Sequence, residues 1–250
     1  MADLKEEPTV ENNDINQAEP AAPKKAIDPS LEGVQFFYEK NKKAITYIGG
    51  GLAILIAALC YYKLYYMPEK EGEAANEIFW AQSYFERDSF NLALKGGVRV
   101  MAPEGPKQML GFEQVAEEYS MTKSGNLANF CAGICLLRTG KYEQGIEFLQ
   151  KYDGDDKVVA PLALGAIGDC HLELNQLDDA VKYYLKASEK GHNSFTTPHF
   201  LKKAGFAYEQ QANYSKALET YERIKKEFPS SNEGKEADRS IAKVKALGNI

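Results

Sequence analysis

The chain of 250 residues is poor in the side chains from which reactive or metal-binding sites are built. It has four cysteines, three histidines and one tryptophan, and no two cysteines stand in a C-x-x-C spacing. Zinc ribbons and thioredoxin-like redox sites need that spacing, and four thiols are too few for a disulfide scaffold of this length. No histidine has a second histidine or a cysteine at ligand spacing on a helix face. We therefore expect no metal and no cofactor.

An excess of positive charge is also missing. Lysine and arginine number 30 against 36 aspartates and glutamates, which gives a formal net charge of −6. Nucleic-acid-binding domains usually carry a basic face, so we expect no nucleic-acid partner. The sequence also has no glycine-rich phosphate loop and no Ser–His–Asp arrangement, and we expect neither catalysis nor a small-molecule substrate.

One long uncharged run is present, at residues 44–62. At 1.5 Å per residue its 19 positions span about 28 Å as a helix, close to the 30 Å of a bilayer core. Tyr61, Tyr62, Tyr65 and Tyr66 crowd its C-terminal end, as aromatic rings do at the level of lipid headgroups. We predict a single transmembrane helix, since the 43 preceding residues are too many for a cleaved signal peptide.

The charges that flank this run predict its orientation. Five lysines precede it closely, whereas Lys70 is the only basic residue between positions 67 and 86. Positive charge stays on the cytoplasmic side, so we expect a cytoplasmic N-terminus and an extracytoplasmic C-terminal domain. In a bacterium this is a single-pass protein of the inner (plasma) membrane, with its domain in the periplasm.

Within the predicted membrane helix, Gly49, Ala53 and Ala57 fall four residues apart. This spacing places three small side chains on one ridge, where a second membrane helix can approach closely. We interpret the ridge as a helix-packing site. The alternative, that small residues are simply frequent in membrane helices, stays open.

The segment before the membrane run divides into two parts. Residues 1–30 contain four prolines, an acidic excess and hardly any large apolar side chain, which predicts a disordered cytoplasmic tail. From residue 31 onward, Val34, Phe36 and Phe37 form an apolar side opposite several lysines. We expect a helix on the inner leaflet that continues into the membrane helix, so that 31–66 is one anchor region. A solvated helical stub is the alternative.

Beyond residue 67 the sequence repeats itself. Three pairs of small residues stand twelve positions apart within each pair, and the pairs recur after 35 and then 37 residues: Gly133 and Gly145, Gly168 and Ala180, Gly205 and Ala217. We expect two antiparallel helices per unit, crossing where these residues let the backbones approach. The pattern resembles the tetratricopeptide repeat, a helix–turn–helix of about 34 residues, and matches it best at 201–229.

This resemblance implies an all-α fold in which residues 67–250 form a solenoid of about three to four helix pairs. The repeats are expected at 126–152, 161–190 and 198–229, with a poorer one at 74–100. An apolar stripe at 231–247 predicts a C-terminal capping helix, which a solenoid needs to shield its last repeat from water. An extra helix is expected at 111–119, and 96–111 is the least predictable stretch.

In stacked helix pairs the first helix of each unit lines the concave side, where partner polypeptides bind. Helical spacing from the small residues predicts the groove-lining set, with the alternative that several members contact neighbouring helices instead. The set is Leu127, Phe130, Ile134, Leu137, Arg138, Asp169, Leu172, Glu173, Lys202, Phe206 and Glu209. Apolar side chains with scattered charge suit an unfolded or amphipathic polypeptide.

Three further features receive a structural interpretation. Cys135 and Cys170 occupy equivalent places in two units, which is typical of small buried packing positions. The acidic run 153–156 lacks the trailing glutamate of a calcium loop, and a solvated turn is favoured. His171 is expected to pack beside its helix pair rather than to bind a ligand.

The order of parts, with a short tail, V-Q-F-F-Y-E-K-N-K-K at 34–43, one anchor and then the repeats, is similar to one bacterial family. It resembles the YfgM-type ancillary subunits of the SecYEG translocon. The resemblance implies a membrane-tethered scaffold that links exported chains to periplasmic chaperones and contacts translocon or foldase helices through its anchor. Two alternatives are a cell-envelope scaffold for division or outer-membrane assembly and, more distantly, an enzyme whose site a partner completes.

Overall fold

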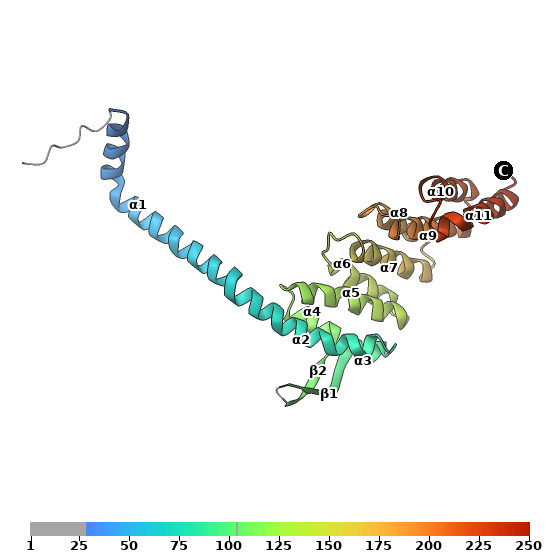
Figure 1. Ribbon diagram of the computed structural model, residues 1–250, viewed down its shortest axis with the longest axis horizontal. Helices are drawn as coiled ribbons and strands as arrows, with labels where there is room; N and C mark the ends of the chain where they lie inside the picture. Colours follow the sequence, from blue (N-terminus) through green and yellow to red (C-terminus); the bar gives the residue numbers. More distant parts are fainter. Residues whose placement is uncertain (1–28, 104) are drawn as a thin grey trace, which may run out of the picture. The chain divides into compact units, whose positions relative to one another are not determined.

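The computed structural model describes residues 29–103 and 105–250 (Figure 1). The predicted tail at 1–30 therefore lies almost wholly outside the described residues. The chain divides into two compact units, one up to Ala58 and the other from Leu59 to Ile250.

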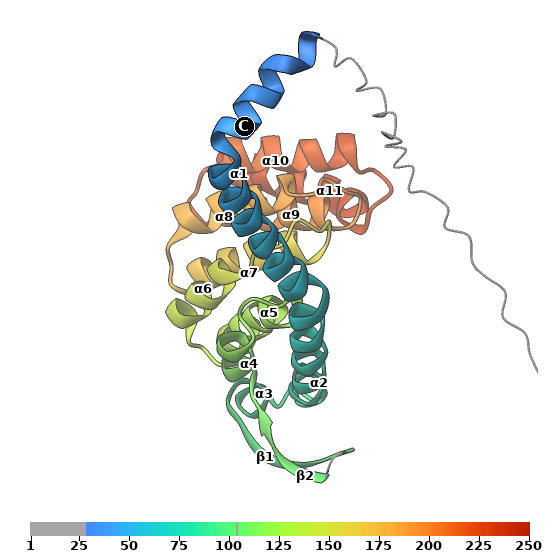
Figure 2. The ribbon, with the colours of Figure 1, turned by 90° about the vertical axis from the view of Figure 1, so that its left-hand side faces the viewer.

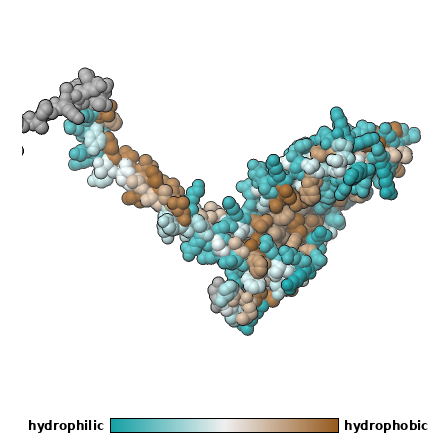
Figure 3. Space-filling view, in the orientation of Figure 1, coloured by the Kyte–Doolittle hydropathy of each residue, from teal (hydrophilic) through white to brown (hydrophobic). Residues whose placement is uncertain are grey.

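The described part of the first unit belongs to one helix, α1, which spans Pro29–Tyr61. It begins at a proline, whose fixed φ and missing N–H suit the first turn of a helix, so the helix starts two residues earlier than expected. Hydrophobic residues cover its middle (Figure 3). Gly49, Ala53 and Ala57 are exposed on it, so their packing against another membrane helix stays a prediction.

The helix does not end where the anchor was expected to end. A π-helical turn, η1, covers Tyr62–Tyr66, and α2 follows directly over Met67–Phe85. Pro68 lacks an N–H and would clash with a carbonyl of the preceding α-turn. The wider π-turn, in which the Met67 N–H donates to the Tyr62 carbonyl, accommodates it. The boundary at 66/67 is therefore a change of helix type and not a break.

The predicted first repeat at 74–100 is wrong at its C-terminal end. Its second helix, α3, covers only Phe90–Lys95, and the chain then forms a hairpin of β1, Gly96–Ala102, and antiparallel β2, Gly105–Leu110. Gly96 permits this turn into a strand because it takes a φ of +67°, which other residues rarely adopt. The hairpin projects from the end of the domain that α2, α3 and α4 form (Figure 2).

After the hairpin the chain is helical throughout, and the helices stack in sequence order (Figure 1). The helices are α4, Phe112–Glu118; α5, Lys123–Arg138; α6, Tyr142–Lys151; α7, Val159–Glu173; α8, Leu177–Glu189; α9, Thr196–Gln210; α10, Tyr214–Glu227; and α11, Asn232–Gly248. The predicted fold class is confirmed: a long apolar N-terminal helix is followed by a solenoid of helix pairs and a final single helix.

Each pair packs through a glycine on its first helix. A Cβ placed on Gly168 would stand 2.7 Å from the Tyr184 ring, and one placed on Gly205 would stand 2.6 Å from the Tyr221 ring. At Gly133 the same position meets the Leu149 side chain. In all three pairs the large side chain follows the glycine by sixteen residues, so the glycine provides the space that this side chain fills.

Candidate functional site

Two adjoining hollows lie along the first helices of the repeats. One, of about 800 Å³, is lined mainly by α5, α7 and α9. The other, of about 860 Å³, is lined mainly by α7, α9 and α11. Asp169, Leu172, His199 and Lys203 belong to both, so the two hollows form one continuous open channel, which we name the groove.

Ten of the eleven predicted groove residues line this groove. They are Phe130, Ile134, Leu137, Arg138, Asp169, Leu172, Glu173, Lys202, Phe206 and Glu209. Leu127 does not: it packs against the buried cluster that α2, α3 and α4 form with α5. The reason is that the extra helix and the membrane-proximal helices cover this part of α5, which an array of identical repeats would leave open. Binding by the other ten remains a prediction.

The groove is apolar where α5 and α7 meet. Phe130, Ile134 and Leu137 are half-buried there, and Leu162 and Leu172 complete the surface from α7. The Phe130 ring lies 5.8 Å from the ring of Tyr152, which holds its orientation. Partly exposed aliphatic and aromatic side chains in a concave surface retain area that a partner's apolar side chains can cover.

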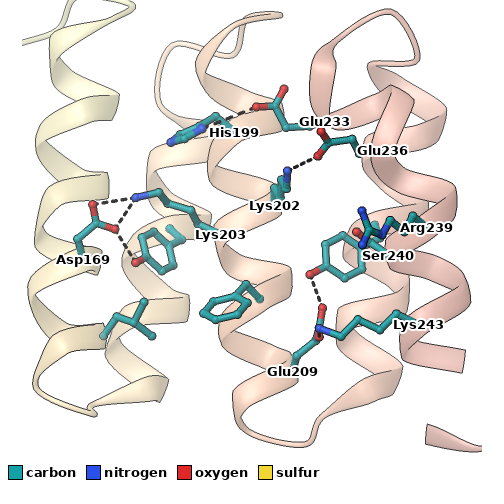
Figure 4. A pocket seen from close by; sticks show the side chains of 14 residues that line it. Asp169, His199, Lys202, Lys203, Glu209, Glu233, Glu236, Arg239, Ser240 and Lys243 are labelled. Atoms are coloured by element: carbon teal, nitrogen blue, oxygen red, sulfur yellow. Dashed lines mark hydrogen bonds and ion pairs between the residues drawn. The ribbon is translucent and has the colours of Figure 1, made fainter. Parts of the chain in front are cut away.

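The groove is polar between α7 and α9, where Asp169 is the central acceptor. Its carboxylate accepts hydrogen bonds from the Tyr184 hydroxyl at 2.6 Å and from the Lys203 ammonium at 2.6 and 2.8 Å (Figure 4). Burial raises the pKa of Tyr184, and the negative charge of Asp169 raises it further. The Tyr184 hydroxyl therefore stays protonated and donates to Asp169, and its hydrogen bond together with that of Lys203 fixes the Asp169 carboxylate in place.

A second acid repeats the arrangement between α9 and α11. Glu209 accepts from the Tyr221 hydroxyl at 2.7 Å and from the Lys243 ammonium at 2.5 Å. Lys202 pairs with Glu236 at 2.5 Å beside them (Figure 4). The shared role of Tyr184 and Tyr221 follows from the repeat, because each fills the space beside a helical glycine and turns its hydroxyl to an acid on the first helix.

Three lysine–carboxylate pairs and one histidine–glutamate contact in the groove share one sequence separation. Asp169 with Lys203, His199 with Glu233, Lys202 with Glu236 and Glu209 with Lys243 are each 34 residues apart. A separation of one repeat length joins equivalent levels of successive repeats. We call this set the charge ladder. Its three lysine–carboxylate pairs neutralise most of the charge in the groove.

His199 is the one imidazole in the charge ladder. Burial lowers its pKa, the positive charge of Lys203 lowers it further, and the acids Glu233 and Asp169 offset only part of this. The ordinary histidine pKa is already below 7, so this ring is neutral at physiological pH. It serves as a packed polar surface with its ring 5.0 Å from that of Phe200.

Sequence reasoning missed the contribution of α11. The apolar stripe of this helix predicted a cap, but its opposite face enters the groove with Glu233, Glu236, Arg239, Ser240 and Lys243. A signal was present in the sequence, since these residues fall on one helix face and three of them lie one repeat length from a titratable residue of α9: Glu233 from His199, Glu236 from Lys202 and Lys243 from Glu209. His199 and Lys203 were also missed.

Three of the four thiols are placed away from solvent. Cys131, Cys135 and Cys170 are buried and unpaired, and burial raises the pKa of each to about 12. A thiol with such a pKa carries almost no thiolate at neutral pH and is a poor nucleophile. The packing role that the sequence suggested agrees with this placement.

The acidic turn at 153–156 is occupied by internal contacts. Asp156 accepts hydrogen bonds from the backbone N–H groups at the start of α7 and from the Tyr152 hydroxyl, and Asp155 pairs with Lys190. These contacts are those of a helix cap. Among residues 29–103 and 105–250, no cluster of three acids, histidines or cysteines is placed to hold a metal ion.

Two segments of the chain match family models. Both models describe the tetratricopeptide repeat, and they match residues 162–189 and 203–231. The chain contains tetratricopeptide repeats. The matched segments cover most of α7 with α8, and most of α9 with α10. No curated protein matches the chain significantly. Such repeats are typical of non-catalytic scaffolds for protein–protein interaction.

Proposed function

We propose that this chain is a membrane-anchored scaffold whose groove holds an extended or amphipathic segment of a partner protein. The observation that carries the proposal is the continuity of the groove from the apolar surface of α5 and α7 to the charge ladder of α9 and α11. A partner segment with apolar side chains at one end and polar ones at the other fits both halves.

The chemistry of the groove favours a polypeptide over a compact ligand. The groove is open and long, and most of its charges are already paired within the chain. A small charged ligand finds few unpaired partners there, whereas an apolar segment buries area against Phe130, Ile134 and Leu137. Newly exported chains expose such segments before they fold.

We place the scaffold at the Sec translocon, where it links exported chains to periplasmic chaperones. Three features support this placement: the helix long and apolar enough to cross a membrane, the lysines before it, and the order of parts shared with YfgM-type subunits. The ridge of Gly49, Ala53 and Ala57 is then a contact for translocon or foldase helices. A cell-envelope scaffold for division or outer-membrane assembly would use the same groove with other partners.

Photocrosslinking in intact membranes tests this proposal. A photoreactive amino acid replaces Phe130 or Phe206 in the full-length chain, and Phe79, an exposed phenylalanine of α2 outside the groove, is the matched control. We expect nascent exported chains or translocon subunits to be captured from the groove positions and not from position 79. Capture of division or wall-synthesis proteins alone would favour the envelope scaffold. Equal capture at all three positions would contradict a groove-based function.

A further inference from the structure

Helices α2 and α5 run side by side in the same direction with a fixed register. Near their beginnings, Glu71 accepts hydrogen bonds from the backbone N–H groups of Lys123 and Ser124 at 2.6 and 3.0 Å. Farther along, Ile78 and Ala81 share one buried cluster with Cys131 and Ala132. A residue of α5 therefore lies level with the residue of α2 that precedes it by about 52 positions.

This register places the loop before α5 close to the tyrosines at the end of the membrane run. Met121 lies in the turn two residues before Lys123, whose N–H group donates to Glu71, and Glu71 is five residues beyond Tyr66. At 1.5 Å per residue, Glu71 lies about 8 Å beyond Tyr66 along the helix. The headgroup layer is itself about 5–7 Å deep on each side of the hydrocarbon core. If Tyr66 sits at headgroup level, the turn that carries Met121 lies at the outer edge of the headgroup layer, within reach of the long methionine side chain.

The loop has the side chains that a lipid surface accommodates. Met121 is 75% exposed and Lys123 is exposed next to it, while Thr122 is buried. The Thr122 hydroxyl donates to the Tyr119 carbonyl at 2.7 Å and accepts from the Gly125 N–H at 2.9 Å. The loop is therefore held in one shape, with an apolar side chain and an ammonium group on its outer surface.

We propose that the α4–α5 loop, residues 119–122, together with Lys123 at the start of α5, rests on the lipid headgroups and forms a second membrane contact beside the anchor. This inference depends on the proposed anchoring of the chain. Met121 enters the interface and Lys123 lies near lipid phosphates, while Glu71 fixes the loop to the helix that emerges from the bilayer. The repeats are then held against the membrane at two points.

Site-directed spin labelling of the full-length chain tests the contact. The protein is reconstituted into vesicles of phosphatidylcholine and phosphatidylglycerol, and a label is attached to Met121→Cys in a Cys60→Ser background. The matched control is Met101→Cys, because Met101 is equally exposed, at 72%. The hairpin that carries Met101 is held to α2 by an ion pair between Lys107 and Glu77. Glu77 lies eleven helical residues, or about 16 Å, beyond Tyr66. A label on the native Cys60 reports whether the anchor is inserted.

We expect the label at position 121 to collide with a water-soluble nickel chelate several-fold less often than the label at 101, and more often with oxygen. Equal nickel collision at 121 and 101, with the Cys60 label in lipid, would overturn the loop contact and leave the anchor standing. A Cys60 label that is fully accessible to nickel would overturn both the loop contact and the membrane anchor. The Cys60→Ser background without a new cysteine should take up no label, because the remaining thiols are buried.

Discussion

At the scale of single residues, the helix pairs depend on glycines that leave room for one large side chain. Gly168 faces the Tyr184 ring and Gly205 faces the Tyr221 ring. Those rings are also the donors that fix Asp169 and Glu209 in the groove. The packing of the repeats and the polarity of the groove therefore depend on the same side chains.

This dependence predicts that Gly168→Ala destabilises the protein, although alanine is the better helix former. The added methyl group would stand 2.7 Å from the Tyr184 ring, and overpacking of this kind costs about 1–3 kcal/mol. Gly72→Ala is the matched control, because no atom lies within 4 Å of its Cβ position on α2. It should raise stability by up to about 1 kcal/mol. Urea unfolding followed by circular dichroism measures both, and equal stability of the two variants would refute the packing role.

At the scale of secondary-structure elements, the decisive contact is the one between α2 and α5. Glu71 receives the first free N–H groups of α5, and a carboxylate is favoured at that position by the helix dipole. Burial works to raise the pKa of Glu71, but hydrogen bonds from Ser124 and from the backbone of Lys123 outweigh it and hold the pKa below its ordinary value. Helix α2 is thereby attached to α5 by an ionised group.

The sign of this shift predicts a pH dependence. Because the folded-state pKa of Glu71 is depressed, its contribution is complete above the ordinary glutamate pKa and is lost as the pH falls through the folded value. Glu71→Gln should therefore cost about 1 kcal/mol at neutral pH. The cost should shrink toward zero in acid. Unfolding curves of both proteins at several pH values check this, and a cost that does not change with pH would contradict the role of the charge.

At the scale of the whole molecule, the repetitive part was predictable and the junctions between parts were not. The twelve-residue pairs and the 35- and 37-residue periods predicted helix pairs because repeated packing imposes a repeated pattern on the sequence. The hairpin at 96–110, the continuous passage from α1 to α2 and the packing of Leu127 against the membrane-proximal cluster each occur where the array of repeats meets a different kind of element. No period exists there to be recognised.

The candidate site was likewise predictable within the repeats and not at the end of the array. Groove residues on the first helices could be placed from one glycine by helical spacing, and ten of eleven line the groove. The groove residues of α11 were missed because the apolar stripe of this terminal helix predicts only its packing as a cap and not the role of its opposite face. His199 and Lys203 were missed because their importance comes from pairing across repeats, which spacing within one helix does not reveal.

The proposed topology predicts the outcome of limited proteolysis. Protease added to intact spheroplasts should digest the repeats from residue 67 onward and leave the N-terminal tail protected, since lysines lie on the tail side of the membrane run. Immunoblots with tags at each end of the chain measure this, with lysed spheroplasts as the control in which both ends are cut. Protection of the C-terminal tag in intact cells would reverse the topology.

The charge ladder also bears on how fast a partner is captured. Opposite charges that are paired within the groove cancel at a distance and leave little field to attract a partner of either sign. Association then proceeds at the rate of unsteered encounters, on the order of 10⁵–10⁶ M⁻¹s⁻¹, and changes little with ionic strength. Under the proposed function, partners are then distinguished by the lifetime of the complex: a chain of any net charge is sampled, and one that covers the apolar half of the groove is retained.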